Sequence, residues 1–159
     1  MPRMARLVVK GEPAVYHVIC RSALDGFALG DVEKEYFVKL LRELSSVYFV
    51  EIFGFSVMGN HAHILLRMDT GEAVSDEEIR RRVRLHDRGE DGRELLDGDI
   101  ARYRERWASL SELMRDLKLR FSRWYNKRSG RRGFFWGERF KSVLLEQGDT
   151  RSSAWRTST

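Results

Sequence analysis

Two histidines separated by one residue, His61 and His63, are the side chains of this sequence best placed to do chemistry. They follow the turn-forming pair Gly59 and Asn60 and open an apolar run. Because side chains alternate between the faces of a β-strand, both imidazoles would lie on one face, with Cα atoms roughly 6–7 Å apart. Such a pair can hold one divalent cation and leave ligand positions open. The alternative is that they are only two polar residues at the end of a half-exposed strand. A His-x-His pattern by itself favours this alternative, and the neighbouring sequence blocks described below favour the metal site.

Positive charge is concentrated in one part of the chain. Residues 109–145 hold ten Lys or Arg and three acidic side chains, a net charge of +7, so the rest sums to −2 of the total of +5. Charge clustered in this way is typical of a surface that binds a polyanion such as nucleic acid. The alternative is an ordinary solvent-exposed helix face that binds nothing. The candidate DNA-binding residues are Arg21, Lys118, Arg123, Lys127, Arg128, Arg131, Arg132, Arg139 and Lys141.

Composition is typical of a globular protein. The 159 residues are 42% hydrophobic and 33% charged, which fits one domain with a real core. The sequence contains no apolar run near the ~20 residues of a membrane span and no stretch typical of a signal peptide, so we expect no membrane partner and a cytoplasmic location. The single Cys20 excludes an intrachain disulfide and a cysteine zinc cage.

Three apolar runs predict the strands that position the histidines. A β-branched and aromatic run predicts a strand over 15–21, and its His17 is interpreted as a structural or DNA-facing residue rather than a third ligand. A second strand is predicted over 47–58, in which Gly54 marks either a bulge or a close approach of backbone. A tight reversal then leads into the strand over 61–68 that carries the histidine pair.

Capping residues mark the predicted helices. Asp31 and Ser75 each precede apolar residues at helical spacing, and Ser109 begins a capping box that opens the longest helix. Residues 86–98 are interpreted as an acidic surface connection in which His86 is exposed. The apolar stripe of the longest helix is formed by Leu110, Leu113, Met114, Leu117, Phe121 and Trp124.

The basic side of that helix is expected to form a positively charged groove beside the histidine pair. An aromatic segment follows it, in which Phe134, Phe135 and Trp136 could stack on bases or fill the core. A final strand is predicted after this segment. The order of elements predicts an α+β fold, an antiparallel sheet with helices packed on one face.

Four blocks of sequence together resemble one family. They are Tyr-His-Val-Ile-Cys-Arg at 16–21, Met-Gly-Asn-His-Ala-His-Ile-Leu at 58–65, Phe-Ser-Arg-Trp-Tyr-Asn-Lys-Arg at 121–128 and Phe-Trp-Gly-Glu-Arg-Phe-Lys-Ser at 135–142. The chain resembles the REP-associated tyrosine transposases, a branch of the single-tyrosine HUH transposase superfamily, over residues 1–149. The resemblance implies one HUH transposase-like domain with a ferredoxin-like sheet and the two histidines on its central strands.

The resemblance also implies a chemistry. His61 and His63 would bind Mg²⁺ or Mn²⁺, which would polarise a scissile phosphodiester. A tyrosine hydroxyl would attack it, leaving a 5′-phosphotyrosine and a free 3′-hydroxyl, so that DNA is cut and rejoined in transposition. The implied partner is single-stranded DNA with a hairpin, bound by a monomer or a homodimer.

The sequence departs from the family pattern after residue 149. Family members continue into a helix that carries the nucleophilic tyrosine and a third metal ligand, whereas residues 150–159 contain neither a tyrosine nor an Asn-Pro pair. We expect a C-terminally truncated protein whose last ten residues form an atypical, disordered tail. Tyr125 is the candidate substitute nucleophile, but its i+4 spacing from Phe121 favours core packing.

The departure leaves three functions open. The chain is a transposase-like protein that binds single-stranded DNA, a catalytically inactive nucleic-acid-binding module that stacks bases on its aromatic segment, or a relic without a selected role. A relic without its final helix would expose an apolar sheet face and aggregate.

Overall fold

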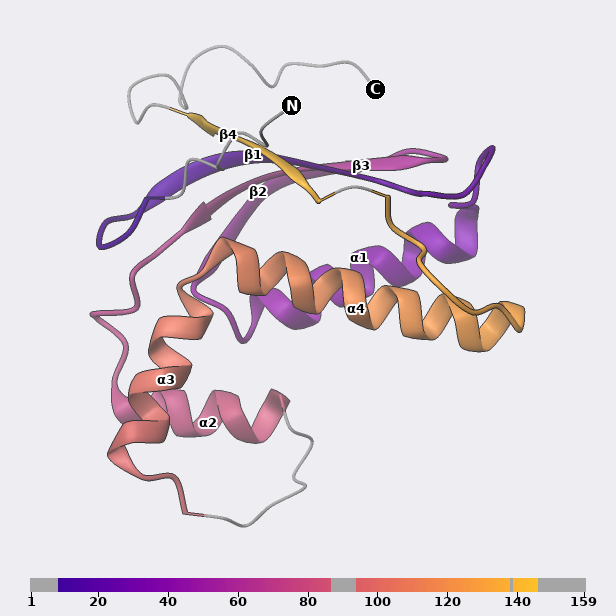
Figure 1. Cartoon of the computed structure of the whole chain (residues 1–159). Coiled ribbons are helices and arrows are strands. Elements are labelled where there is room, and N and C mark those ends of the chain that lie inside the picture. The colour runs from indigo at the N-terminus through magenta and orange to yellow at the C-terminus, as the bar shows by residue number, and fades with distance from the viewer. Residues whose placement is uncertain (1–8, 87–93, 138, 146–159) are drawn as a thin grey trace.

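The structure is a computed structural model that describes residues 9–86, 94–137 and 139–145. These residues form four strands and four helices (Figure 1). The elements are β1 (Ala14–Arg21), α1 (Asp31–Ser45), β2 (Val50–Val57), β3 (His61–Met68), α2 (Asp76–His86), α3 (Asp97–Trp107), α4 (Leu110–Ser129) and β4 (Lys141–Leu145). The predicted tail, 150–159, lies outside the described residues.

The four strands form one antiparallel sheet in the order β2-β3-β1-β4. This order, with α1 between β1 and β2 and α4 before β4, is that of the ferredoxin-like fold. The hairpin between β2 and β3 closes where the Met58 N–H donates to the His61 carbonyl at 2.8 Å, around Gly59 and Asn60. The predicted fold class and the predicted reversal are therefore confirmed.

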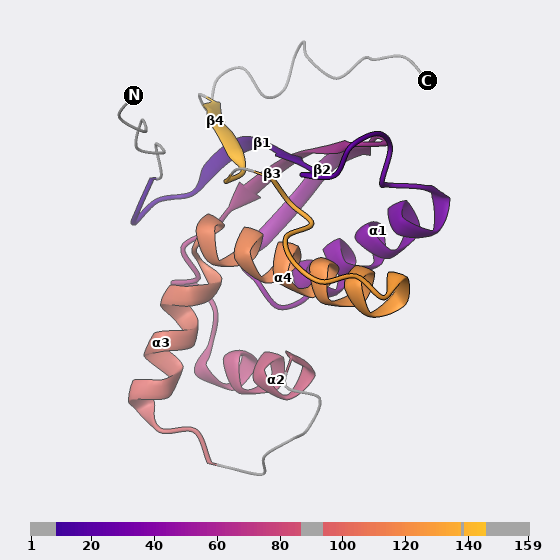
Figure 2. The ribbon, with the colours of Figure 1, turned by 45° about the vertical axis from the view of Figure 1, so that its right-hand side comes forward.

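Helices α1 and α4 cover one face of the sheet, which lies above them in Figures 1 and 2. Alternate side chains of the two central strands point toward these helices and are buried: Ala14, Tyr16, Val18 and Cys20 on β1, and Ala62, Ile64, Leu66 and Met68 on β3. They pack with the apolar stripe of α4 in one core. The remaining side chains of β1 and β3 belong to the other face, over which the described part of the chain places no helix.

The second strand is shorter than predicted. It begins at Val50 instead of residue 47, because the Val47 and Tyr48 N–H groups bond to the Leu44 carbonyl at the end of α1. The Phe49 N–H then bonds to the Trp107 carbonyl at 2.9 Å. Of the two alternatives for Gly54, the bulge is confirmed, since the register of β2 against β3 shifts between Ile52 and Gly54.

Two of the three predicted caps are observed. The Ser75 and Ser109 hydroxyls accept the N–H groups of Glu78 and Glu112, at 3.2 and 3.3 Å. Asp31 is not a cap: it is the first residue of α1, and Gly30 occupies the N-cap position. The acidic side chain of Asp31 still lies at the positive end of the helix dipole.

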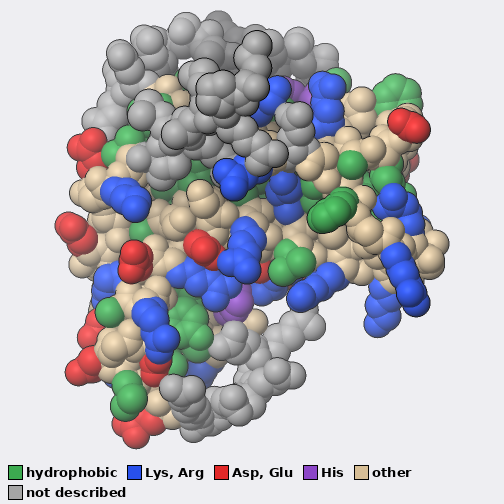
Figure 3. Space-filling model, viewed as in Figure 1, with side chains coloured by type: hydrophobic (Ala, Val, Ile, Leu, Met, Phe, Trp, Pro, Cys, Tyr) green, Lys and Arg blue, Asp and Glu red, His purple; other side chains and the backbone are tan. Residues whose placement is uncertain are grey.

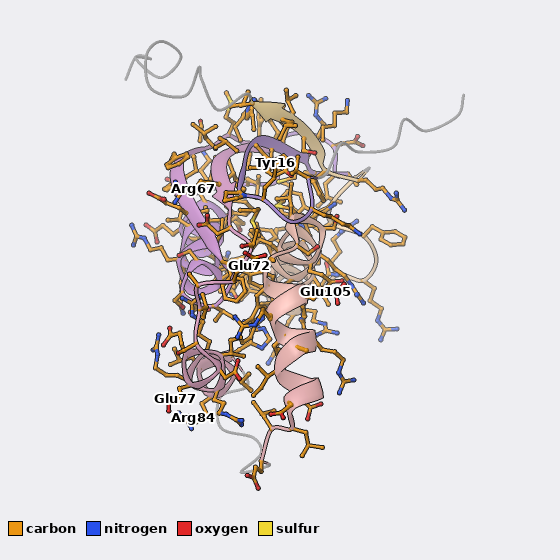
Figure 4. The ribbon with its side chains drawn as sticks, turned by 90° about the vertical axis from the view of Figure 1, so that its left-hand side faces the viewer. Tyr16, Arg67, Glu72, Glu77, Arg84 and Glu105 are labelled. Atoms are coloured by element: carbon orange, nitrogen blue, oxygen red, sulfur yellow. The ribbon has the colours of Figure 1, made fainter. Side chains whose placement is uncertain are left out.

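Helices α2 and α3 form a pair beyond α1 and α4, away from the sheet (Figures 1 and 2). Figure 4 shows Glu77 and Arg84 on α2 well below the part of the sheet that carries Tyr16 and Arg67, with Glu105 on α3 at a height between them. The Arg104 guanidinium joins the pair by an ion pair to Asp76 at 2.7 Å. The described residues contain no helix long and apolar enough to cross a membrane.

His86 is not the exposed residue that the sequence predicted. Its side chain is only 11% exposed, and its Nε2 lies 3.2 Å from Oδ2 of Asp116 on α4. The same carboxylate accepts from the Tyr48 hydroxyl at 3.1 Å and from Arg120 Nε at 2.9 Å. This cluster links α2 to α4 and to the segment between α1 and β2. Residues 87–93 of the predicted surface connection lie outside the described part of the chain.

Candidate metal and nucleic-acid site

The two histidines lie on the same face of β3. Their ring centroids are 5.0 Å apart and the rings are nearly perpendicular, at 75°. Both side chains are half-buried, whereas Ala62 between them is fully buried on the helix side. Strand alternation therefore places both imidazoles on the face opposite α1 and α4.

Strand β1 brings further side chains to the pair. The register sets Arg21 opposite His61 and Ile19 opposite His63. His17 lies diagonally from His63, with its Nε2 3.0 Å from Nδ1 of His63 and the two rings stacked at 5.2 Å. This contact depends on the register between two strands far apart in sequence, so the spacing of residues could not predict it.

The hairpin turn contributes the other neighbour of the pair. Oδ1 of Asn60 lies 2.6 Å from Nδ1 of His61. The backbone of the turn is fixed from outside, because its Asn60 and Gly59 carbonyls accept the N–H groups of Ser22 and Leu29, both at 2.9 Å. The position of Asn60 beside His61 is thus set by the loop that follows β1.

Burial and neighbouring charges favour the neutral forms of His61 and His17. Burial, the nearby His63 and the positive charge of Arg21 lower the pKa of His61. Burial and His63 also lower the pKa of His17. The neutral form of an imidazole retains one nitrogen lone pair, which is the form that a metal ion binds.

The described side chains do not enclose an ion. Within residues 9–86, 94–137 and 139–145, no three His, Cys, Asp or Glu side chains converge in a way that could hold a metal. The available metal ligands are two imidazoles, and the Nδ1 of each lies near an atom that can accept a hydrogen bond. That set fits a cation whose other ligands are oxygens from outside the protein, such as water or phosphate.

Two of the candidate DNA-binding residues border the histidines. Arg21 is exposed directly opposite His61, and Lys141 on β4 is exposed directly opposite Ile19. Because Ile19 also pairs with His63, Lys141 lies two strands from His63 on the same face, about 10 Å away at Cα. Arg139 is exposed two residues before Lys141.

The other basic candidates do not border the histidines, because α4 packs on the opposite face. The expected groove between this helix and the histidine pair is therefore wrong. Lys and Arg side chains gather instead over the C-terminal end of α4 (Figure 3). The exposed ones there are Arg123, Lys127, Arg128 and Arg132, with Arg131 half-buried beside them.

Two residues of this basic set are engaged in packing. Arg128 pairs with Glu33 at 2.8 Å and lies over the Trp124 ring, 5.4 Å from its centroid. Lys118 lies deeper: its carbonyl accepts from Trp136 Nε1 at 3.2 Å, and its charge acts on the buried Cys20. Burial outweighs that charge and raises the pKa of the Cys20 thiol to about 12, as expected for a core residue.

The tyrosines lie on the helix side of the sheet. Tyr125 packs against Phe121 and Phe135, with ring centroids 6.2 and 4.5 Å away. The other four are Tyr16 on the helix-facing side of β1, Tyr36 stacked on Trp124, Tyr48 bonded to Asp116 and Tyr103 beside Trp107. These five are all the tyrosines of the sequence, and the structure describes each of them.

The aromatic segment after α4 divides between core and surface. Phe135 is 0% and Trp136 5% exposed, so these two rings cannot stack on bases. Phe134 is 88% exposed, and Phe27, in the loop after β1, is 82% exposed. The segment is held at the end of β1, because the Ala23 N–H donates to the Phe135 carbonyl at 2.7 Å.

Two solved structures resemble this chain. One is a REP-associated tyrosine transposase bound to a REP hairpin, with a TM-score of 0.55 and 14% identity over 92% of this chain and 63% of that chain. The other is a candidate transposase from Deinococcus radiodurans R1, with a TM-score of 0.47 and 14% identity over 92% of this chain and 88% of that chain. Comparisons with family models and with curated proteins found no match. The fold of the family that the sequence resembles is confirmed.

Proposed function

We propose that this chain is a transposase-like protein that binds single-stranded DNA carrying a hairpin, with the histidine face of the sheet against the phosphodiester backbone. The observation that carries the proposal is that His61 and His63 on β3 share a face of the sheet with Arg21 on β1 and Lys141 on β4, and that no described helix covers this face. Two imidazoles beside two cations suit a phosphate and its metal ion.

His61 and His63 would hold the cation, Mg²⁺ or Mn²⁺, which when bound would polarise a phosphodiester and stabilise charge on its oxygens. Arg21 and Lys141 would bind phosphates on the side of the histidines where β1 and β4 lie. The roughly 10 Å between β3 and β4 leaves room for the backbone of a single strand between the histidines and Lys141. The chain's own residues thus bind and orient the backbone.

The hairpin would extend from this face around the end of the sheet to the basic end of α4. Arg21 lies at that end, and the loop after it bonds both to the hairpin turn and to the aromatic segment. The exposed ring of Phe27 belongs to this loop and that of Phe134 to the aromatic segment, and unpaired bases could stack on both. The similar transposase is itself bound to a REP hairpin, which supports this partner.

The chain is not expected to form the phosphotyrosine bond by itself. A nucleophile must come within about 3.5 Å of the phosphorus, and all five tyrosines lie on the side of the sheet away from the histidines. Tyr125 in particular is packed between Phe121 and Phe135. We therefore propose DNA binding that the cation strengthens, without cleavage.

Fluorescence anisotropy with a labelled hairpin single strand tests this function. Mn²⁺ should tighten binding to the wild-type protein but not to the His61→Ala or His63→Ala variant, and denaturing gels should show no covalent adduct. Arg115→Gln, exposed near the start of α4, is the matched control that should keep the Mn²⁺ effect. Equal affinity for the hairpin and for a plain duplex would contradict the proposal, as would an adduct that Tyr125→Phe abolishes.

A second candidate function is a nucleic-acid-binding module that uses no metal. The two exposed rings, Phe27 and Phe134, favour it, because stacking and basic side chains alone can bind a single strand. The two functions differ in the histidines. If His61→Ala leaves both Mn²⁺ affinity and DNA affinity unchanged, the module without metal is the better description.

A further inference from the structure

His61 and His63 are each contacted by a neighbouring side chain at the same ring nitrogen, Nδ1. Each of the two imidazoles has its Nδ1 against one atom of an adjacent side chain: Asn60 Oδ1 at 2.6 Å for His61, and His17 Nε2 at 3.0 Å for His63. The two contacts come from different elements, the hairpin turn and strand β1. Both involve the same ring nitrogen.

The Asn60 contact determines the tautomer of His61. A carboxamide oxygen has no hydrogen to donate, so the hydrogen of this bond belongs to Nδ1 of His61. A neutral imidazole carries only one N–H, and its Nε2 then keeps the lone pair. Asn60 is itself fixed, because its carbonyl accepts the Ser22 N–H at 2.9 Å.

The His17 contact admits two arrangements. If Nδ1 of His63 carries the hydrogen, it donates to His17 and leaves Nε2 of His63 with a lone pair. If His17 Nε2 carries the hydrogen, His63 accepts it, and the Nε2 of His63 becomes a donor that cannot bind a cation. The two arrangements give His63 opposite roles toward a phosphate.

We propose that Asn60 and His17 are positioning residues that hold His61 and His63 in the same tautomer, with hydrogen on Nδ1 and the lone pair on Nε2. This inference rests on the proposed function, since that tautomer makes both rings metal ligands. A hydrogen bond from the second ring nitrogen to a fixed acceptor orients an imidazole and raises its basicity as a ligand. Here two different acceptors give one geometry to two neighbouring ligands.

Nitrogen NMR of the metal-free protein tests the tautomers directly. In long-range ¹H–¹⁵N spectra at pH 8, His61 and His63 should each show a protonated Nδ1 and an unprotonated Nε2. His17→Phe should change the His63 pattern alone, and Asn60→Ala the His61 pattern alone. An Nε2-protonated His63 in the wild type would overturn the inference, and it would do so whether or not the chain binds DNA.

Metal affinity provides the second readout. By EPR of free Mn²⁺, His17→Phe and Asn60→Ala should each weaken Mn²⁺ binding about 10- to 100-fold. His17→Gln, whose Oε1 can still accept from His63, should bind Mn²⁺ nearly as the wild type does. Val143→Ala, opposite His17 on β4, is the control for a general disturbance of this face. Unchanged affinity in His17→Phe, or equal losses in His17→Phe and His17→Gln, would contradict the positioning role.

Discussion

Arg21 of β1 and His61 of β3 are directly paired residues on adjacent strands, and both side chains lie on the face of the sheet opposite α1 and α4. The pairing places the Arg21 guanidinium, which can bind phosphate, beside the His61 imidazole, which can bind a metal ion. It also explains part of the lowered pKa of His61, after burial and the charge of His63. The phosphate and the metal ion would meet at this pair of residues.

Arg21→Gln should weaken binding to single-stranded DNA and reduce its dependence on salt. Loss of one phosphate contact lowers the slope of log K against log salt by about 0.7 for a single strand. The same change should raise the pKa of His61, because a nearby positive charge that opposes its protonation is removed. Anisotropy at several salt concentrations and an NMR titration measure the two effects. Arg115→Gln, which is exposed near the start of α4, should change neither; equal slopes for both variants would contradict the role of Arg21.

Phe134 and Phe135 form a matched pair for separating binding from folding. Phe134→Ala should weaken DNA binding by about 1–3 kcal/mol while leaving the free energy of unfolding nearly unchanged, because the ring is exposed. Phe135→Ala should lower the free energy of unfolding by about 3–5 kcal/mol, because a fully buried ring leaves a cavity. Urea unfolding and anisotropy distinguish the two. A folded Phe134→Ala protein with wild-type DNA affinity would show that this ring does not contact bases.

Asp116 should make stability depend on pH in the acid range. Burial alone would raise the pKa of this carboxyl, but the hydrogen bond from His86 and the charge of Arg120 outweigh it and lower the pKa to about 2. The ionised form therefore stabilises the fold fully above the ordinary pKa of 3.8, and this contribution is lost as pH falls toward 2.

Asp116→Asn should lower the free energy of unfolding by about 2 kcal/mol at pH 7, and the deficit should shrink below pH 4. Urea unfolding at a series of pH values measures it. Glu43→Gln, in the exposed pair with Lys39, is a control that should show no such pH dependence. A deficit of constant size from pH 7 to pH 2.5 would mean that the carboxylate charge is not the cause.

Gly59→Ala should disturb the turn that carries Asn60. A Cβ at this position would lie 2.5 Å from Cδ1 and 2.9 Å from Cγ of Phe27, so the ring must move. We expect a loss of about 1–3 kcal/mol in the free energy of unfolding, which Phe27→Ala should largely restore in the double variant. Thermal or urea unfolding of the wild type, the two single variants and the double variant gives the coupling free energy between Gly59 and Phe27. Additive effects would show that the ring does not press on the glycine.

The strands could be predicted from sequence because their signals are local. The alternation of His61, Ala62 and His63 predicts one shared face for the imidazoles, and the turn at Gly59 predicts the hairpin. Both features depend on residues within a few positions of one another. Ser109 likewise caps its helix through a residue three positions away.

The features that the sequence did not predict depend on contacts between segments far apart in the chain. Nothing local to α4 says which face of the sheet it covers, and its basic residues were therefore predicted beside the wrong face. The contact between His17 and His63 requires the register of β1 against β3, and the burial of His86 requires Asp116, 30 positions away. Phe134 and Phe135 are adjacent and identical in type, so only the packing of the segment separates the exposed ring from the buried one.

Paramagnetic broadening by Mn²⁺ tests most directly whether the histidine pair is a cation site on the DNA-binding face. With ¹⁵N-labelled wild-type protein, substoichiometric Mn²⁺ should broaden the signals of His61, His63 and Arg21 first, and a hairpin single strand should sharpen this selectivity. His63→Ala should abolish the pattern. Broadening confined to the acidic residues of α2, or equal broadening in wild type and variant, would contradict the account.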